Sequence, residues 1–225
     1  FLSSSFSELL CATPDSFLVD LGGGTGAFTS RLRRDLGLRR RALVVDPSQG
    51  LLNGAAEFAD DVETLLADAD GFLGKLATAE VDPPQLVILK EVVHHVPRWA
   101  SVASSLYSLL PSPSRVVIMT RPPTSHHFPF FPAAHDEWAR HQEPPSAYAG
   151  PLEAAGFGVE VVERAYGVDM AKQQWLDMMR GRFWSTFSAF GDDELEEGVR
   201  RVDREHPGER LAFEDRLCFI VAVKA

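Results

Sequence analysis

Apolar residues gather in seven short runs along the chain, with stretches of helical spacing between them. Strands that alternate with helices are typical of a mostly parallel sheet. The runs at 86–89 and 116–119 contain no polar position, which predicts strands in the middle of a sheet that is covered on both faces. The seven predicted strands span residues 17–21, 42–46, 63–66, 86–90, 115–120, 159–163 and 217–223. This pattern predicts a doubly wound α/β sheet.

Two intervening stretches carry a clear helical stripe of apolar residues. The first stripe contains Phe28, Leu32 and Leu36, with Gly37 placed to end the helix. The second contains Trp99, Val102, Leu106 and Leu109 or Leu110, with Pro97 suited to the first turn and Pro111 ending the run. The second stripe predicts a crossover helix between the two central strands.

Two segments break the alternation of strands and helices. Residues 121–145 follow the fifth strand and are rich in proline, histidine and aromatic residues, with a short helix expected at about 133–141. Residues 171–205 predict two further helices, the second capped by Asp192 or Asp193. An excursion at the carboxyl end of a strand usually covers a site, so we expect both segments to cover a substrate.

The composition is that of a globular protein with one core. A chain of 225 residues with 45% hydrophobic and 24% charged residues suits a single domain spanning residues 1–225 and argues against disorder. No apolar run approaches the roughly 20 residues that cross a bilayer, so we expect a soluble protein that does not engage a membrane. Cys11 and Cys218 lie far apart, which suits a reducing, cytoplasmic compartment. The sequence begins at Phe1 rather than methionine, so an upstream leader is compatible with it.

The charge balance disfavours nucleic acid as a partner. A formal net charge of -10 repels phosphate backbones. One basic run lies on the first predicted helix and its exit, and comprises Arg31, Arg33, Arg34, Arg39, Arg40 and Arg41. We interpret it as a solvated helix face, with a phosphate-binding patch as the alternative.

The strongest motif is the sequence FLVDLGGGTG at residues 17–26, an apolar strand that leads through Asp20 into glycines that open a helix. Glycines at alternate positions let the backbone turn sharply and leave room for a ligand to lie against it. The second strand ends in Asp46, 20 residues after Gly26, where a carboxylate can accept hydrogen bonds from ribose hydroxyls. A third acid, Asp68, follows the third strand. Three strand ends therefore point to one nucleotide-like ligand at the carboxyl edge of the sheet.

The segment from Asp20 to Gly26 resembles the first motif of the class I S-adenosylmethionine-dependent methyltransferases. The resemblance implies a Rossmann-like, seven-stranded sheet whose last strand is antiparallel, and S-adenosylmethionine as cofactor with S-adenosylhomocysteine as product. It also implies that the glycine loop borders the methionine part of the cofactor, the second-strand acid binds the ribose and the third-strand acid binds the adenine. The expected cofactor-binding residues are Asp20, Gly22, Gly23, Gly24, Gly26, Asp46, Pro47, Asp68, Ala69 and Lys90.

A nicotinamide dinucleotide site is the rival interpretation. Gly22, Gly24 and Ala27 also satisfy the G-x-G-x-x-A form of that fingerprint. Carboxylates at Asp20 and Asp68 argue against it because a pyrophosphate would be repelled by them, whereas a methionine ammonium would be attracted. The third alternative is that the three glycines form only a tight turn and bind no ligand.

The fourth strand ends in a polar stretch, Lys90 to His95. It resembles the corresponding stretch of plant-type O-methyltransferases, in which a histidine is the base, although those enzymes continue with Asp-Trp where this chain has His95-Val96. The resemblance implies a catalytic role for His94, with His95 as the second candidate; hydrogen-bonded structural histidines are the alternative.

Histidines and aromatic residues in the two covering segments are further candidates. A metal site drawn from the histidines of the first group with Asp136 or Glu137 is disfavoured because no two of these histidines lie four residues apart, so we expect no metal. Ordinary loop packing is favoured for the first group. For the second, core packing is favoured over the roof of an apolar substrate pocket. The first group comprises His126, His127, Phe128, Phe130, Phe131, His135, Trp138 and His141; the second comprises Trp175, Met178, Met179, Phe183, Trp184 and Phe187. Arg180 and Arg182 are expected to face solvent, with an acceptor carboxylate as the alternative.

These observations predict a methyltransferase that acts on a small molecule. No Asn-Pro-Pro-Tyr-like tetrapeptide follows the fourth strand, which removes the family signature for exocyclic amino groups of bases. O-, S-, N- and C-methylation stay open, with a hydroxyl acceptor slightly favoured. The alternatives are a catalytically silent cofactor-binding regulatory module and an NAD(P)-dependent oxidoreductase. We expect a monomer or homodimer.

Overall fold

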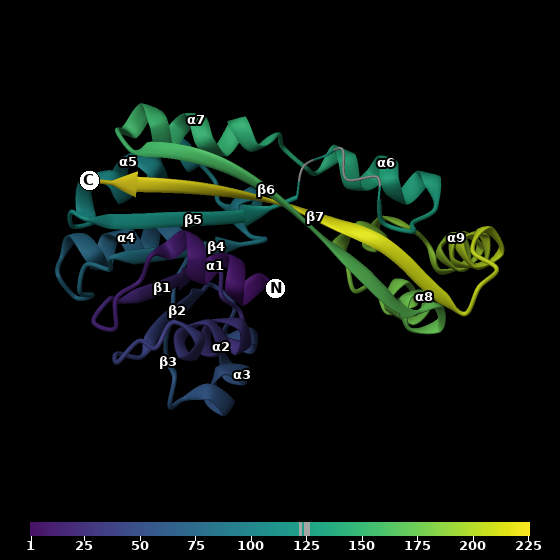
Figure 1. Cartoon of the computed structure of the whole chain (residues 1–225), viewed down its shortest axis with the longest axis horizontal. Helices are drawn as coiled ribbons and strands as arrows, with labels where there is room; N and C mark the ends of the chain where they lie inside the picture. Colours follow the sequence, from purple (N-terminus) through teal and green to yellow (C-terminus); the bar gives the residue numbers. More distant parts are fainter. Residues whose placement is uncertain (122, 124–126) are drawn as a thin grey trace. The chain divides into compact units, whose positions relative to one another are not determined.

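The computed structural model describes residues 1–121, 123 and 127–225 of the chain (Figure 1). The strands are β1 (Leu18–Leu21), β2 (Ala42–Asp46), β3 (Val62–Leu66), β4 (Leu86–Lys90), β5 (Ser114–Thr120), β6 (Gly158–Ala171) and β7 (Arg210–Lys224). The helices are α1 (Leu2–Leu10), α2 (Ala27–Asp35), α3 (Gln49–Gly54), α4 (Ala69–Ala77), α5 (Trp99–Leu109), α6 (Pro132–Arg140), α7 (Pro145–Ala155), α8 (Lys172–Arg180) and α9 (Asp192–Glu205).

The strands form one seven-stranded sheet in the order β3-β2-β1-β4-β5-β7-β6. Strands β1 to β5 pair in parallel, and β7 pairs antiparallel with β5. The Rossmann-like fold with an antiparallel last strand is therefore confirmed, as are the central positions of β4 and β5. The strand order reverses between β1 and β4, and open α/β sheets bind ligands at such a switch point.

The described residues divide by packing into two compact units. The first unit comprises Phe1–Thr120, Pro145–Val162 and Cys218–Ala225, and the second comprises Arg121–Pro144 and Glu163–Leu217. The prediction of a single methyltransferase domain over residues 1–225 stays a prediction.

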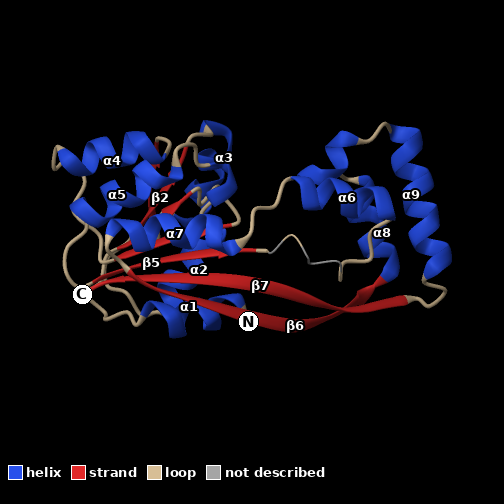
Figure 2. Ribbon diagram, turned by 90° about the horizontal axis from the view of Figure 1, so that it is seen from above, coloured by secondary structure: helices blue, strands red, loops and turns tan. Residues whose placement is uncertain are grey.

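The first unit is a three-layer structure built on the sheet. Alternate residues of β1, β2, β4 and β5 pack under α4, α5 and α7, which Figure 2 shows grouped on one side. Trp99 anchors this layer because its indole nitrogen donates a 2.9 Å hydrogen bond to the carbonyl of Tyr148 in α7. On the other side Phe6 of α1 packs edge-to-face against Phe28 of α2 and Phe219 of β7.

The second unit has its own aromatic core. It contains α6, α8, α9 and the outer parts of β6 and β7. The two segments that the sequence assigns to substrate cover therefore pack together, and the core residues are Phe128, Phe130, Phe131, Ala134, Trp138, Trp175, Leu176, Met179, Phe187, Leu195, Val199, Val202 and Leu211. Within it, the indole nitrogen of Trp175 donates a 2.9 Å hydrogen bond to the carbonyl of Pro129.

The sequence underestimates the last two strands. β6 continues to Ala171 and β7 begins at Arg210, whereas the apolar runs predict only residues 159–163 and 217–223. Beyond the apolar runs β6 alternates half-buried and exposed positions, and β7 alternates exposed positions with buried or half-buried ones, a pattern of strands with one solvated face.

Two predicted helix starts are wrong. Pro97 precedes the N-cap of α5, Arg98, instead of lying in the first turn. The N-cap of α9 is Gly191, not Asp192 or Asp193, and the side chain of Glu194 accepts a 3.0 Å hydrogen bond from the Gly191 amide. Glu194 reaches back in the manner of a capping box, so the two aspartates lie inside the first turn, where the helix dipole favours acids.

No helix within the described ranges has both the length and the apolar character needed to span a bilayer.

Candidate functional site

The carboxyl ends of β1 to β4 surround a pocket of about 90 Å³ in the first unit. Its lining comprises Leu21, Gly22, Val45, Pro47, Ala67, Asp68, Ala69, Asp70, Val92, His95, Val96 and Pro97. Ligand sites typically measure about 300–1,000 Å³, so this pocket suits one part of a nucleotide-like ligand rather than all of it. Of the residues predicted from the sequence to bind a cofactor, Gly22, Pro47, Asp68 and Ala69 line this pocket.

The glycine loop after β1 has the backbone conformation that the motif predicts. Gly22, Gly24 and Gly26 have φ values of 79°, 58° and 71°. These values lie in the left-handed region, where a side chain is strained. The Gly22 amide donates a 2.7 Å hydrogen bond to the Val45 carbonyl, which ties the start of the loop to β2. A Cβ on Gly22 would lie 2.3 Å from a methyl carbon of Val92, so the loop packs tightly against the segment after β4.

Gly22→Ala is expected to destabilise the protein by about 2–5 kcal/mol, the sum of a left-handed φ and overpacking against Val92. Gly37 provides a matched control because its φ is 66° and a Cβ there would meet nothing within 4 Å. Gly37→Ala should therefore cost only about 1–2 kcal/mol, the conformational part alone. Urea unfolding of both variants measures the difference, and equal losses would show that the contact with Val92 does not constrain the loop.

Asp46 is positioned by the glycine loop. Its two carboxylate oxygens accept hydrogen bonds from the backbone amides of Ser48, at 2.8 Å, and Gly24, at 3.0 Å. The side chain is only 6% exposed. Each oxygen keeps a further lone pair, since a carboxylate has about four acceptor sites. The structure thus places Asp46 beside the loop, as the sequence predicts, although it is not among the residues that line the pocket.

Asp20 is buried beneath the same loop. It is 1% exposed, and the Thr29 hydroxyl donates a 2.5 Å hydrogen bond to its Oδ2. Within the described part of the chain its Oδ1 has no hydrogen-bond partner. Burial raises the pKa of Asp20 to about 6; the Thr29 hydrogen bond and the charge of Lys90 oppose this shift, and the charge of Asp46 adds to it. A buried carboxylate with an unsatisfied oxygen is a place where a cationic donor would be stabilised.

Asp68 has a structural role as well as a place in the pocket. It is the N-cap of α4, and its Oδ1 accepts a 2.8 Å hydrogen bond from the Gly71 amide. Its second oxygen remains available to a ligand. The neighbouring Arg98 and Asp70 form an ion pair at 2.6 Å at the rim.

The two candidate histidines lie side by side in the segment after β4, but only one of them lines the pocket. Their rings contact each other with centroids 4.0 Å apart, but only His95 lines the pocket; His94 is half-buried. Glu91 precedes them with φ of 57°, and such strained non-glycine residues cluster at functional sites. Lys90, also predicted to bind cofactor, lies with its Nζ 5.4 Å from the ring centroid of Phe28 and lowers the pKa of Asp20 by its charge, a smaller effect than burial.

Sequence reasoning missed Thr29 and Val92. Thr29 is the partner of Asp20, and its position nine residues later, on the first turns of the following helix, is a signal that could have been used. Val92 contacts Gly22 across 70 residues of sequence, and no local pattern predicts that contact.

The aromatic stripe of α8 and the segment after it are mainly core. Trp175, Met179 and Phe187 are buried in the second unit, whereas Phe183 is exposed and packs edge-to-face on Trp184 with ring centroids 4.9 Å apart. Phe128, Phe130 and Phe131 belong to the same core, which confirms packing for these residues. His126 lies outside the described residues. Among the side chains that the structure describes, no three histidine, cysteine or acidic residues are grouped as a metal site.

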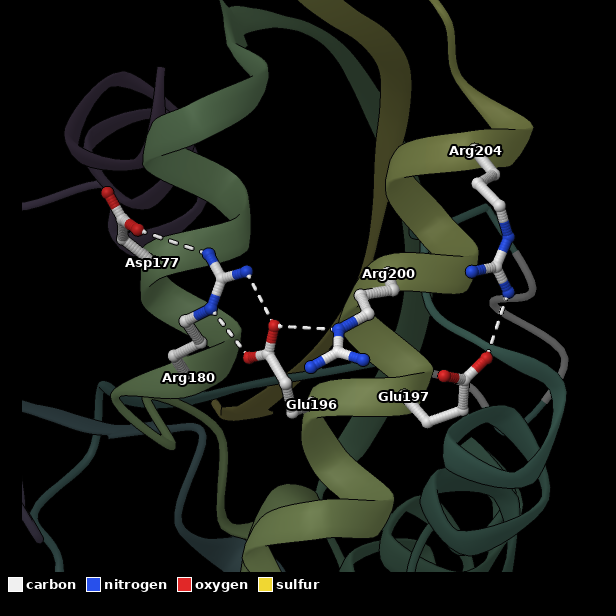
Figure 3. Close-up of polar contacts among 6 residues, drawn as sticks. All are labelled: Asp177, Arg180, Glu196, Glu197, Arg200 and Arg204. Atoms are coloured by element: carbon white, nitrogen blue, oxygen red, sulfur yellow. Dashed lines mark hydrogen bonds and ion pairs between the residues drawn. The ribbon is translucent and has the colours of Figure 1, made fainter.

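The arginines considered as acceptor ligands have protein partners. Arg180 of α8 binds Glu196 of α9 through two hydrogen bonds (Figure 3). Within α9, Arg200 pairs with Glu196, and Arg204 pairs with Glu197. Arg182 pairs with Asp192 at 2.8 Å. The basic run is likewise paired, with the ion pairs Arg31–Asp35, Arg33–Asp61, Arg34–Asp61, Arg39–Asp15, Arg40–Asp82 and Arg41–Glu63. This pairing supports a charged surface rather than a phosphate patch.

Comparison with known proteins agrees with this geometry. Residues 4–191 match the sequence family described as Methyltransferase domain. A search of curated proteins by sequence found no match.

Three solved structures share the fold. A candidate methyltransferase from Bacillus halodurans C-125 is 15% identical with a TM-score of 0.64, covering 99% of this chain and 98% of its own. A candidate methyltransferase from an antibiotic biosynthesis pathway of Anabaena variabilis is 16% identical with a TM-score of 0.69, covering 98% and 96%. Phosphoethanolamine N-methyltransferase 2 of Haemonchus contortus, solved with phosphomonomethylethanolamine and S-adenosylhomocysteine, is 17% identical with a TM-score of 0.62, covering 99% of this chain and 52% of its own.

The family match spans most of the chain, and the solved structures share its fold. This protein is therefore a methyltransferase that belongs to the methyltransferase domain family.

Proposed function

We propose that this methyltransferase uses S-adenosylmethionine to methylate a small-molecule acceptor, with a hydroxyl group as the favoured target. The observation that carries the proposal is the buried Asp20, whose Oδ1 has no partner in the described chain, beneath the glycine loop of a methyltransferase domain. When bound, S-adenosylmethionine supplies a methyl group that its sulfonium charge has already activated.

The residues of the first unit fit this cofactor. Gly22 lines the pocket without a side chain, and Asp20 offers an acceptor to a cationic ammonium group. Asp46, at the end of β2, would hold the ribose hydroxyls. Val45 and Ala67 give the pocket apolar walls that suit an adenine ring, with Asp68 at its edge for the amino group. The Haemonchus enzyme, which shares the fold, was solved with the corresponding product S-adenosylhomocysteine.

The small-molecule class rests on charge and on the family signatures that are absent from the sequence. A net charge of -10 disfavours a nucleic acid acceptor. Positioning an acceptor in a dry site supplies up to about 7–11 kcal/mol, and a base adds to this when a hydroxyl must lose its proton. His94 is the proposed base, and residues 121–145 and 171–205 are the proposed acceptor cover.

Calorimetry with S-adenosylhomocysteine and with NADPH tests the cofactor. The proposal expects binding of the first and none of the second, because a pyrophosphate would be repelled by the carboxylates of Asp20 and Asp68. Binding of NADPH alone would overturn it. Transfer of a labelled methyl group to a metabolite extract tests activity; firm cofactor binding without any transfer would instead support a silent regulatory module.

The affinity for S-adenosylhomocysteine is expected to rise as the pH increases from 5 to 7, with a midpoint near the pKa of about 6 that burial gives Asp20. The pKa of Asp20 in the folded protein lies above its ordinary value, so the folded protein holds this proton more tightly than the unfolded chain does. Ionisation of Asp20 therefore lowers the folding stability. It also creates the negative charge that attracts an ammonium group. Asp20→Asn should abolish the pH dependence.

Adenosine provides the control because it lacks the ammonium group. Its affinity should stay constant over the same pH range. A pH dependence for adenosine equal to that for S-adenosylhomocysteine would assign the titration to another group.

A further inference from the structure

We propose that a second pocket in the first unit binds a small organic acid, a carboxylate that carries an apolar body. The pocket measures about 320 Å³ and is lined by Leu10, Cys11, Thr13, Ser16, Gln85, Leu86, Pro111, Ser112, Pro113, Ser114, Arg115 and Val223. We call it the edge pocket, because β4 begins at Leu86 and β5 begins at Ser114, so it lies at the amino-terminal edge of the parallel sheet. The cofactor pocket lies at the opposite, carboxyl edge.

The edge pocket contains a cation and no acid. None of its lining residues is aspartate or glutamate, in a chain whose net charge is -10. The guanidinium of Arg115 donates one hydrogen bond, from Nη1 to the Leu9 carbonyl at 3.1 Å, and no carboxylate of the described residues pairs with it. A guanidinium has five N–H donors, so most of its donors are left for a ligand. The paired arginines at 31–41 show that this chain supplies carboxylates to its exposed arginines elsewhere.

A buried hydroxyl supplies a second, independent sign of a ligand. Ser114 is 2% exposed, and its Oγ has no hydrogen-bond partner among the described residues. Buried polar groups are nearly always satisfied, so an unsatisfied one requires a partner. Nearby, the Oε1 of Gln85 accepts a 2.9 Å hydrogen bond from the Phe17 amide, which leaves the amide NH₂ of Gln85 as a further donor.

The remaining walls define the ligand's body. Leu10, Leu86, Pro111 and Val223 are apolar, and the volume falls in the range of about 300–1,000 Å³ that is typical of small-molecule sites. A bare inorganic anion would leave these walls without contact. A carboxylate held bidentately by Arg115, with an apolar group against the half-buried Pro111 and Val223, uses both halves of the lining.

Cys11 offers a direct readout of occupancy. It lines the edge pocket and is exposed, whereas Cys218, the other cysteine of the chain, is buried and serves as an internal reference. Benzoate is the probe, and the rate at which the neutral reagent iodoacetamide alkylates Cys11 is measured by mass spectrometry. We expect benzoate to slow alkylation of Cys11, and benzamide, its neutral isostere, to leave the rate unchanged. Saturating S-adenosylhomocysteine should not reverse the protection.

Variants separate the site from unspecific binding. Arg115→Met should weaken benzoate binding about tenfold or more, the effect of losing hydrogen bonds to a charged group. Arg115→Lys should retain part of the affinity, and Ser114→Ala should lose several-fold. Arg216→Met removes an exposed arginine that pairs with Glu214 outside the pocket and should have no effect. Should Arg115→Met fail to fold, Arg115→Lys and Ser114→Ala still decide the question.

The inference would be overturned if benzoate failed to protect Cys11, or if it protected wild type and the Arg115 and Ser114 variants equally. Displacement of benzoate by S-adenosylhomocysteine would also overturn it, by assigning benzoate to the cofactor site. Protection by inorganic phosphate but not by benzoate would refute the organic-acid class.

Discussion

His94→Ala is expected to lower turnover about 100-fold to 10,000-fold, the usual contribution of a general base, while cofactor affinity stays close to that of wild type. The reason is position: His94 follows β4 at the carboxyl edge of the sheet but is not among the residues that line the cofactor pocket. The measurement is single-turnover methyl transfer together with calorimetric binding of S-adenosylhomocysteine. An effect of this size is expected when the acceptor is a hydroxyl or another group that must lose a proton during methyl transfer.

His95→Ala provides the matched control, since the two histidines are adjacent and their ring centroids are 4.0 Å apart. His95 lines the cofactor pocket, so its loss should weaken cofactor binding more than it slows turnover. Unchanged turnover in His94→Ala would remove its role as the base. A loss of turnover confined to His95→Ala would transfer that role to His95.

Asp215→Ala is expected to destabilise the second unit by about 3–5 kcal/mol, the cost of leaving one partner of a buried ion pair uncompensated. Asp215 accepts two hydrogen bonds from Arg121, at 2.9 and 2.8 Å, and one from the Tyr166 hydroxyl at 2.8 Å. The side chains of Asp215 and Arg121 are only 6% and 14% exposed, so solvent screens the pair weakly. Urea unfolding followed by tryptophan fluorescence measures the loss.

The ion pair between Arg210 and Asp169 is the control for this prediction. It has a similar distance, 2.7 Å, but its side chains are 60% and 63% exposed. Asp169→Ala should therefore cost at most about 1 kcal/mol. Similar losses in the two variants would mean that burial does not set the strength of the Asp215 pair.

The sequence predicts the central sheet well because its signals there are local. β2 and β4 have the predicted bounds, since each apolar run is bounded by polar or turn-forming residues. β6 is nearly three times as long as its predicted run and β7 about twice as long, because a strand with one solvated face carries polar residues that the run criterion rejects. The predicted N-cap of α9 is wrong because Gly191, Asp192 and Asp193 are adjacent and all suit that position.

The candidate cofactor residues follow from the same local logic. Parallel strands end at one edge, so acids and glycines at the ends of β1, β2 and β3 must come together. Spacing cannot separate His94 from His95, because two adjacent residues follow the same strand. Only the folded chain shows that His95 lines the pocket while His94 does not.

By itself, then, the sequence determined the succession of strands and helices and the chemistry at the strand ends, because periodicity and glycine conformation are properties of neighbouring residues. Tertiary structure alone decided which groups are buried without a partner, such as Oδ1 of Asp20 and Oγ of Ser114. It also decided that the two segments predicted to cover a substrate share one aromatic core, and that Leu10, Leu86 and Val223 line one pocket. Burial and hydrogen-bond satisfaction depend on residues far apart in the chain, and no local pattern records them.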